Sequence, residues 1–310
     1  MKWISPFFAF AALQLVSVLA APANQIVKRT STTESASVGY ATLNGGTKGG
    51  AGGTTTTVTT LSALTSAVSG DSVQNRTITG NTVVKVGSNT SVLGASGSLL
   101  SGIGLRVLEE SNVIIRNVKI QKVLADAGDA IGIQESHNVW VDHVDLSSDL
   151  DHDKVRYDGL LDITHGSYGI TVTNSKLYNH WKASLVGHSD NNGSEDVAIR
   201  QNLNSRGPSF RFGQGHIFNN YYVDLNDGIN TRDEAQLLIE NNVFTGTTKA
   251  IYSTDGGYAV ASGNDFGDDG KNTASTGTIS ASSLGYSYTL LATSKVASSV
   301  KSSAGQTLSF

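Results

Sequence analysis

The chain has 310 residues, with 34 glycines, three prolines and no cysteine, and its formal net charge is −4. The lack of cysteine excludes a disulfide scaffold, a thiolate metal site and a cysteine nucleophile. A negative net charge with no basic tail argues against nucleic acid and anionic membranes as partners. Charged residues make up only 15% of the chain, and Ser, Thr, Gly and Val dominate, which indicates a folded, β-rich chain rather than a disordered one.

Residues 1–20 have the pattern of a secretory signal peptide. Lys2 precedes an apolar stretch that ends in small residues. This stretch is too short to span the hydrocarbon core of a bilayer, which argues against a membrane anchor. The dibasic pair Lys28-Arg29 suggests a pro-segment over residues 21–29, although such a pair also arises by chance. We therefore predict a secreted, extracellular protein whose mature chain begins after this pair.

Three Asn-X-Ser/Thr sequons fit the same exported route. They lie at Asn75, Asn89 and Asn192, and each is a potential site of N-glycosylation. A single sequon is a weak signal, so these sites agree with export without establishing it. Beyond the leader, no stretch of the sequence is apolar and long enough to suggest a membrane span.

An internal repeat runs through the second half of the chain. The sequence NNYY at residues 219–222 recurs as NNVF at 241–244 and as GNDF at 263–266, with a spacing of 22 residues both times. Each copy follows a short apolar stretch. Looser copies lie upstream, at residues 112–117, 138–143 and 169–174. A fixed period of this length is typical of a solenoid.

The repeat unit favours a parallel β-helix over the alternatives. It is shorter than the roughly 30 residues of a strand–helix–strand crossover, and too β-branched and glycine-rich for a helical repeat. Propeller blades of about 40 residues do not match, and a sandwich gives no reason for the fixed period. We predict a single-stranded, right-handed parallel β-helix. Repeated residues would stack between coils, namely asparagines 117, 174, 220, 242 and 264, and inside them Tyr222, Phe244 and Phe266.

The open ends of such a solenoid need covers. Residues 60–68 carry apolar side chains at a spacing of three and four, which predicts a short N-terminal capping helix. The Ser-, Thr- and Gly-rich stretch from about Asp268 is expected to pack back along the coils as a tail. We predict one domain over residues 30–310 and expect a monomer.

Acidic residues are densest between residues 126 and 162. Asp149, Asp151 and Asp153 alternate as in an EF-hand loop. That interpretation fails, because Lys154 stands where the turn needs glycine and Leu160 where the loop needs a bidentate glutamate.

The phase of the repeat groups other aspartates. Asp129 lies 12 residues before Val141, and Asp162 lies 10 before Val172, its equivalent. Both differences are even, so both carboxylates are predicted to face the same groove from neighbouring coils, with Asp158 close by. Three converging carboxylates need a cation between them, and oxygen ligands suit Ca²⁺. Alternatively, these are solvated aspartates in turns.

Basic residues follow downstream. Arg206 lies 12 residues before Phe218, which we take as the equivalent of Val141, so it is predicted to share the phase of the acidic groove. Arg211 and Lys182 add two more cations. A groove with a divalent cation and several basic side chains suits a polyanionic polymer that carries carboxylates. The alternative for each basic residue alone is a surface ion pair.

Four ordered motifs make a family resemblance specific. NVWVDHVDLSSD, DGLLDITHGS, HWKASLVGHSD and NSRGPSFRFG resemble the pectate lyases of polysaccharide lyase family 1, most closely the fungal secreted branch, and the match extends over nearly all of residues 39–310. The resemblance implies Ca²⁺-dependent β-elimination on polygalacturonate to unsaturated products. It places the calcium ligands at Asp129, Asp158 and Asp162, the base at Arg206, and contacts to substrate carboxylates at Lys182 and Arg211.

Two departures from the family pattern bear on activity. Between Glu195 and Arg206 an aromatic run of the family is absent, and about ten residues are missing from a full coil. Residues 69–84 also lack a strand that relatives carry. Three other functions therefore stay open. They are a pectin lyase, which retained aspartates argue against; a polygalacturonase, whose Arg-X-Lys motif is absent; and a non-catalytic β-helix that binds pectate.

Overall fold

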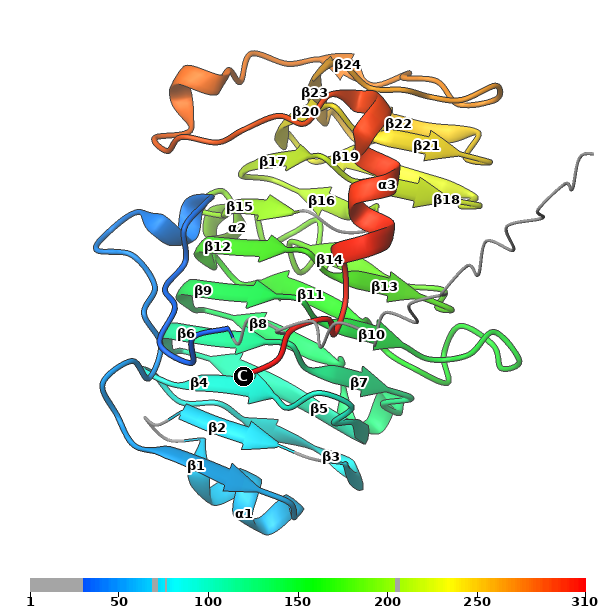
Figure 1. The fold of residues 1–310 in the computed structure, drawn as a ribbon. Helices are drawn as coiled ribbons and strands as arrows, with labels where there is room; N and C mark the ends of the chain where they lie inside the picture. Colours follow the sequence, from blue (N-terminus) through cyan, green and yellow to red (C-terminus); the bar gives the residue numbers. More distant parts are fainter. Residues whose placement is uncertain (1–29, 69–71, 76, 204–206) are drawn as a thin grey trace, which may run out of the picture.

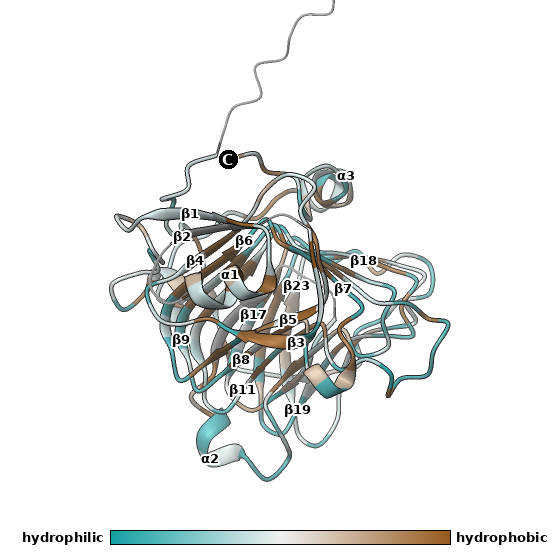
Figure 2. Ribbon diagram, turned by 90° about the horizontal axis from the view of Figure 1, so that it is seen from below, coloured by the Kyte–Doolittle hydropathy of each residue, from teal (hydrophilic) through white to brown (hydrophobic). Residues whose placement is uncertain are grey.

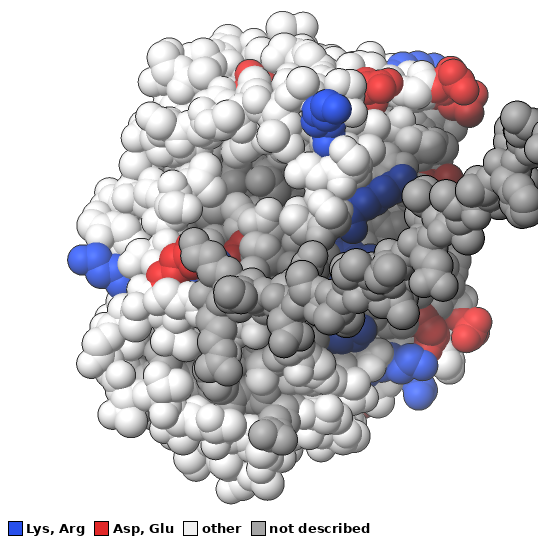
Figure 3. Space-filling model, in the orientation of Figure 1, with Lys and Arg blue, Asp and Glu red and all other residues white. Residues whose placement is uncertain are grey.

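The computed structural model describes residues 30–68, 72–75, 77–203 and 207–310. Its strands wind into a stack of coils with parallel strands lying above one another, which confirms the predicted parallel β-helix (Figure 1). The predicted signal peptide and pro-segment, residues 1–29, lie outside the described residues. Few charged side chains cover the face in Figure 3, in keeping with the low charge content.

The first sheet runs the length of the stack. Its neighbours are paired in parallel, one strand from each coil. In spatial order its strands are β1 (Thr55–Val58), β2 (Ser72–Asn75), β4 (Ser91–Gly94), β6 (Ser111–Arg116), β9 (His137–Asp142), β12 (Tyr168–Thr173), β15 (Arg200–Leu203), β17 (Gln214–Phe218), β20 (Gln236–Glu240), β23 (Tyr258–Ser262) and β24 (Ser275–Thr276).

The second sheet forms another wall of the stack. Its strands are β3 (Ile78–Lys85), β5 (Leu100–Leu108), β8 (Ile131–Gln134), β11 (Leu161–Thr164), β14 (Ser184–Val186), β16 (Ser209–Arg211), β19 (Asp227–Arg232) and β22 (Lys249–Ser253). A third wall consists of β7 (Lys119–Gln121), β10 (Asp145–Ser147), β13 (Lys176–Tyr178), β18 (Tyr221–Val223) and β21 (Val243–Thr245). The long strand β5 joins the two walls, because it pairs with β7 at its start and with β8 at its end.

The inside of the stack is filled by aliphatic and aromatic side chains in columns. Tyr222 stacks on Phe244 at 4.6 Å between ring centroids, and Phe244 on Phe266 at 5.6 Å, as predicted. The register aligns Val141 with Val172, also as predicted. It then aligns Val172 with Leu203 and Leu203 with Ile217, so the choice of Phe218 as the next equivalent was wrong by one residue.

An asparagine ladder connects three coils. Asn220 Nδ2 donates to Asn242 Oδ1 at 2.8 Å, and Asn242 Nδ2 donates to Asn264 Oδ1 at 2.9 Å. Asn117 and Asn174 do not continue this ladder. They have positive φ, like Asn219 and Asn241, and therefore occupy the preceding turn position, where asparagine tolerates the left-handed conformation.

A short helix covers the N-terminal end of the stack. The helix α1 (Leu61–Ala67) lies at one end, where Leu64 is buried and the Thr60 hydroxyl accepts a hydrogen bond from the amide of Ala63, which confirms the predicted cap (Figure 2). Two further short helical segments lie in loops, namely η1 (Tyr40–Thr42) and η2 (Ala125–Ala127).

The C-terminal stretch packs back along the coils, as expected from its composition. Tyr288 donates to Glu240 on the first sheet at 2.6 Å, and the amide of Leu308 donates to Asn117 Oδ1 at 2.9 Å. Between these contacts lies an unpredicted helix, α3 (Thr293–Ser303), which packs against β18 and β21. Its apolar content is low, with Val296 fully buried, so its sequence gives little helical periodicity. The stretch also contains η3 (Ala281–Ser283).

Candidate active-site groove

The outer face of the second sheet carries the predicted acidic residues. Strand pairing aligns Arg106 with Gly132, Gly132 with Asp162, and Asp162 with Leu185. Asp162 therefore projects from the middle of β11, where its neighbours on either side are apolar and point inward. The parallel register thus fixes one row of outward side chains across four coils.

Asp129 reaches this row from the turn before β8. Its Oδ1 accepts a hydrogen bond from the amide of Gly159 at 3.0 Å. Gly132 leaves room for the carboxylate, because a Cβ there would lie 3.1 Å from Asp129 Oδ2. Burial first, and then the negative charge of Asp158, raise the pKa of Asp129 to about 6, against the hydrogen bond from Gly159 and the Arg106 and Lys182 cations.

The pKa of Asp162 is raised by burial and by the same group of carboxylates. Its Oδ1 accepts a hydrogen bond from the amide of Leu185 at 3.0 Å. Burial and then the charge of Asp129 raise the pKa of Asp162 well above its ordinary value. A side chain at position 159 would collide with this carboxylate, so Gly159 is required here. The fold therefore brings Asp129, Asp158 and Asp162 within range of one another's charge.

Asp158 is already paired with a cation. Lys182 Nζ lies 2.8 Å from Asp158 Oδ1, and both side chains are almost half exposed. His180 donates from Nε2 to the backbone carbonyl of Asp158 at 2.5 Å, and its Nδ1 lies 2.5 Å from Ser148 Oγ. These contacts fix the backbone of the loop that carries Asp158.

The three carboxylates do not form a closed set of ligands. Within the described residues, no three Asp, Glu, His or Cys side chains are grouped closely enough to hold a metal ion directly. The chemistry of the donors fits Ca²⁺ nonetheless, because all three are oxygen ligands, and desolvation and mutual repulsion raise the pKa values of Asp129 and Asp162. A cation would relieve that repulsion once Asp158 turned away from Lys182.

Arg211 lies further along the same face. Strand pairing aligns it with Arg232, and it lies two residues beyond Ser209, which continues the row of Asp162 and Leu185. Its Nε donates to Asp190 Oδ1 at 2.6 Å and lies 3.5 Å from Asp233 Oδ2. Arg232 reaches the same Asp190 oxygen at 3.3 Å. Arg211 thus stands in a network of ion pairs, which is the alternative that the sequence left open for each basic residue, with partners that no motif indicated.

The position of the predicted base, Arg206, cannot be compared with these residues. Arg206 lies outside the described residues. Its predicted phase depended on Phe218, and the register instead selects Ile217. By contrast, the sequence missed Arg106, whose charge lowers the pKa of Asp129 and whose buried Nε has no hydrogen-bond partner. No local motif marks Arg106, because only the pairing of β5 with β8 brings it to the site.

The coil before Arg211 is short. After α2 (Gly193–Asp196) and β15, the chain enters β16 with no strand of the third wall among the described residues between them. This agrees with the gap that the sequence indicated between Glu195 and Arg206. The other indicated gap, over residues 69–84, contains β2 and most of β3.

The three sequons differ in their surroundings. Asn89 is exposed in a turn, and its Oδ1 accepts a hydrogen bond from Asn112. Asn75 ends β2. The side-chain nitrogen of Asn192 is buried without a hydrogen-bond partner, so attachment of a glycan there requires a local rearrangement.

Across the described ranges, no helix has the length and apolar character that a membrane crossing demands.

Relatives of known sequence share the whole chain. Pectate lyase A of Aspergillus niger is 54% identical over 325 aligned positions, which cover 100% of this chain and 99% of that protein. Pectate lyase A of Emericella nidulans is 53% identical, with 98% of each chain covered. The first alignment is longer than the 310 residues of this chain, so the relative has positions that this chain lacks.

Solved structures agree in fold. A pectate lyase from Bacillus sp. N165, solved in complex with trigalacturonate, is 28% identical with a TM-score of 0.75, covering 87% of this chain and 98% of that chain. Pectate lyase II from Xanthomonas campestris is 26% identical with a TM-score of 0.72 and the same coverage. The model of the pectate lyase family matches residues 13–309. This chain therefore belongs to the pectate lyase family and is a lyase.

Proposed function

We propose that the protein is a secreted, Ca²⁺-dependent pectate lyase that cleaves (1→4)-α-D-galacturonan by β-elimination. The observation that carries the proposal is the cluster of Asp129, Asp158 and Asp162 beside Lys182, on the face of the second sheet. Family membership supports the reaction class. The trigalacturonate in the Bacillus relative supports a polygalacturonate substrate.

In this proposal, Asp129, Asp158 and Asp162 would hold the calcium ion. When bound, Ca²⁺ neutralises a substrate carboxylate and so makes the neighbouring C5 proton more acidic. Lys182 would exchange its contact with Asp158 for a substrate carboxylate, and Arg211 would bind another one from its place between Asp190 and Asp233.

The proposed base is Arg206, which takes the C5 proton. The electrons of that C–H bond form the C4–C5 double bond, and the C4–O4 bond breaks with its electron pair going to O4. The O4 alkoxide takes a proton from water, giving a 4,5-unsaturated oligogalacturonide. An arginine side chain has a pKa above about 12 and is a poor base at neutral pH. Activity is therefore expected to rise above neutral pH.

A calcium titration of ultraviolet product formation on polygalacturonate tests the function. We expect absorbance of the unsaturated product to rise with Ca²⁺, to vanish with EDTA, and to be lost in Arg206→Lys, which keeps the charge. A rate that peaks in acid and ignores EDTA would contradict the proposal. A methyl-esterified substrate that is cleaved faster than pectate would favour a pectin lyase instead.

One observation favours a second candidate, a β-helix that binds pectate without cleaving it. Arg206 lies in the short sequence between β15 and β16, where the described residues contain no strand of the third wall. Binding of polygalacturonate by the wild type with no unsaturated product at any pH would support this candidate.

Export is part of the same proposal. The signal peptide over residues 1–20, the pro-segment ending at Lys28-Arg29 and a glycan at Asn89 fit an enzyme whose polymeric substrate lies outside the cell. N-terminal sequencing of protein from the culture medium, with and without deglycosylation, tests the two cleavage points and the glycan.

A further inference from the structure

The third wall of the stack is interrupted between β13 and β18. A strand of the third wall follows within a few residues after each of five first-sheet strands, namely β6, β9, β12, β17 and β20. After β15 no such strand is present in the described part of the chain. Consequently β13 pairs with β10 and β18 with β21, and the wall falls into two parts.

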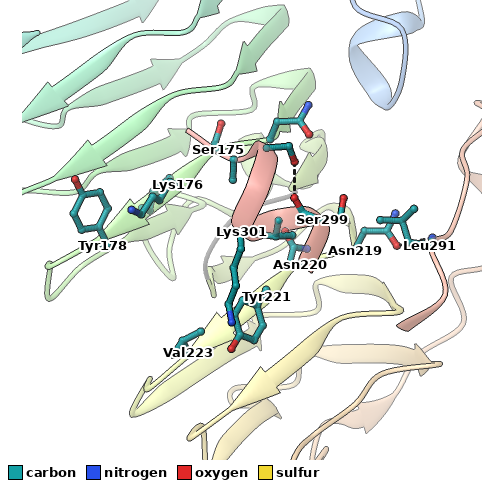
Figure 4. Close-up of a pocket in the computed structure, with 15 residues that line it drawn as sticks. Ser175, Lys176, Tyr178, Asn219, Asn220, Tyr221, Val223, Leu291, Ser299 and Lys301 are labelled. Atoms are coloured by element: carbon teal, nitrogen blue, oxygen red, sulfur yellow. Dashed lines mark hydrogen bonds between the residues drawn. The ribbon is translucent and has the colours of Figure 1, made fainter. Parts of the chain in front are cut away.

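A cavity of about 460 Å³ lies at this interruption (Figure 4). One side consists of residues 174–178 on and before β13, and the other of residues 219–223 around β18. The helix α3 closes it with Ser299, Lys301 and Ala304. Its volume lies within the range of pockets that bind small ligands. It opens on a different wall from the acidic groove, which lies on the second sheet.

Two lysines give the cavity a positive charge. Lys176 Nζ lies 4.4 Å from the ring centroid of Tyr178, and Lys301 Nζ lies 5.0 Å from that of Tyr221. Figure 4 shows each lysine beside its tyrosine. Each ring attracts its ammonium group and holds it at the cavity wall. Neither lysine forms an ion pair with any residue that the structure describes. The nearby Asp145 instead accepts a hydrogen bond at its Oδ1 from the hydroxyl of Tyr178, at 3.0 Å.

Most other polar side chains of the lining are already hydrogen-bonded within the protein. The Asn219 amide donates to the carbonyl of Thr289 and accepts from the amide of Leu291, and the Ser175 hydroxyl donates to the carbonyl of Thr173. Leu291 adds apolar surface. The two ammonium groups can bind carboxylates, and apolar surface accepts the C–H face of a pyranose ring. Charge and apolar surface together match a small saccharide that carries carboxylates.

We propose that this cavity is a second carbohydrate site, separate from the cleavage groove, which binds a short galacturonate chain. The choice of galacturonate among acidic sugars rests on the proposed function. The site arises from the shortened coil, because a full coil would place a strand where the cavity lies.

Calorimetric titration with digalacturonate in EDTA tests the site without requiring catalysis. The test variant is the double substitution Lys176→Ala and Lys301→Ala, and the matched control is Lys295→Ala, an exposed lysine on the same helix and outside the cavity. We expect the double variant to bind about tenfold more weakly or worse, since two charge-assisted contacts are lost. Lys295→Ala should bind like the wild type.

Two further arms separate this site from the groove and from general anion binding. In a Lys182→Ala background, which removes a proposed groove contact, the double substitution should weaken digalacturonate binding under EDTA by the same factor as in the wild type, and neutral digalactose should not bind. Loss of binding in Lys182→Ala with retention in the double variant would overturn the proposal, as would no binding by the wild type or equal competition by sulfate. The lyase assay on polygalacturonate decides the proposed function separately, so the two can fail independently.

Discussion

Lys182 Nζ lies 2.8 Å from Asp158 Oδ1, so a proposed substrate contact is paired with a proposed calcium ligand. The pair keeps both side chains in the groove when no substrate is bound. It also implies an exchange of partners, in which a cation takes Asp158 and a uronate takes Lys182.

Removal of Lys182 should separate these two roles. In Lys182→Met, Asp158 loses its partner and the cluster becomes more negative, so Ca²⁺ affinity should hold or increase. The rate should fall by about 100-fold or more, because a substrate contact is lost. Calorimetric Ca²⁺ titration and initial rates on polygalacturonate measure the two effects, with the exposed Lys154→Met as control. Parallel loss of affinity and rate would argue against the exchange.

Asp129→Asn should stabilise the metal-free protein, but only at higher pH. The folded pKa is about 6 and the ordinary value is 3.8, so the folded state holds the proton more tightly. Stability therefore falls as pH rises from about 4 to 6, by up to about 3 kcal/mol at 1.36 kcal/mol per pKa unit. Thermal melts in EDTA should show a higher Tm for the variant at pH 8 and little difference at pH 4. An equal shift at both values would mean that charge is not the cause.

His216 should make the C-terminal stretch sensitive to acid. Its side chain is fully buried, lies 2.7 Å from the Tyr286 hydroxyl and 3.1 Å from Glu240, and burial lowers its pKa to about 4. The unfolded chain protonates near the ordinary value of 6.5, so stability is lost as pH falls from 6.5 towards 4, by up to about 3 kcal/mol.

Urea unfolding of the wild type and of His216→Gln checks this loss. The difference in unfolding free energy between pH 7 and pH 5 should be smaller in the variant, even though the variant is less stable at pH 7. His188→Gln, on the second-sheet side, serves as a control. If both variants keep the wild-type dependence, His216 does not titrate as its burial requires.

The asparagine in the middle of the ladder, Asn242, should contribute more to the free energy of unfolding than Asn264 at its end. Asn242 Oδ1 accepts from the backbone and side chain of Asn220, while its Nδ2 donates to the Ile217 carbonyl and to Asn264. Asn242→Ala leaves buried groups unsatisfied on both adjacent coils and should cost about 2–4 kcal/mol. Asn264→Ala, at the end of the ladder, should cost roughly half as much. Chemical denaturation measures both, and equal costs would show that the ladder does not act through its middle member.

The coil, its period and the side chains inside it followed from the repeat in the amino-acid sequence. A 22-residue repeat predicted parallel stacking, and the aromatic column of Tyr222, Phe244 and Phe266 followed from it, because strands of equal phase must superpose. The alignment of Val141 with Val172 followed for the same reason. The prediction failed at Phe218, because the positive-φ turn residue Asn174 corresponds to Asn219 and not to Asn220, which makes Ile217 the equivalent of Val172.

Which charged side chains lie close together depends on the tertiary structure and could not be predicted from the sequence. Strand register brings Arg106 beside Asp129 over a separation of 23 residues, and it ties Arg211 to Asp190 and Asp233, although no short motif spans these pairs. The cavity between β13, β18 and α3 likewise depends on the stacked fold, because it lies where the third wall is interrupted. The helix α3, which closes it, has little apolar periodicity in its sequence. Local patterns specify the strands, because each inward face needs apolar residues. The partners of an outward side chain depend on the neighbouring coils, and only the stacked fold sets them side by side.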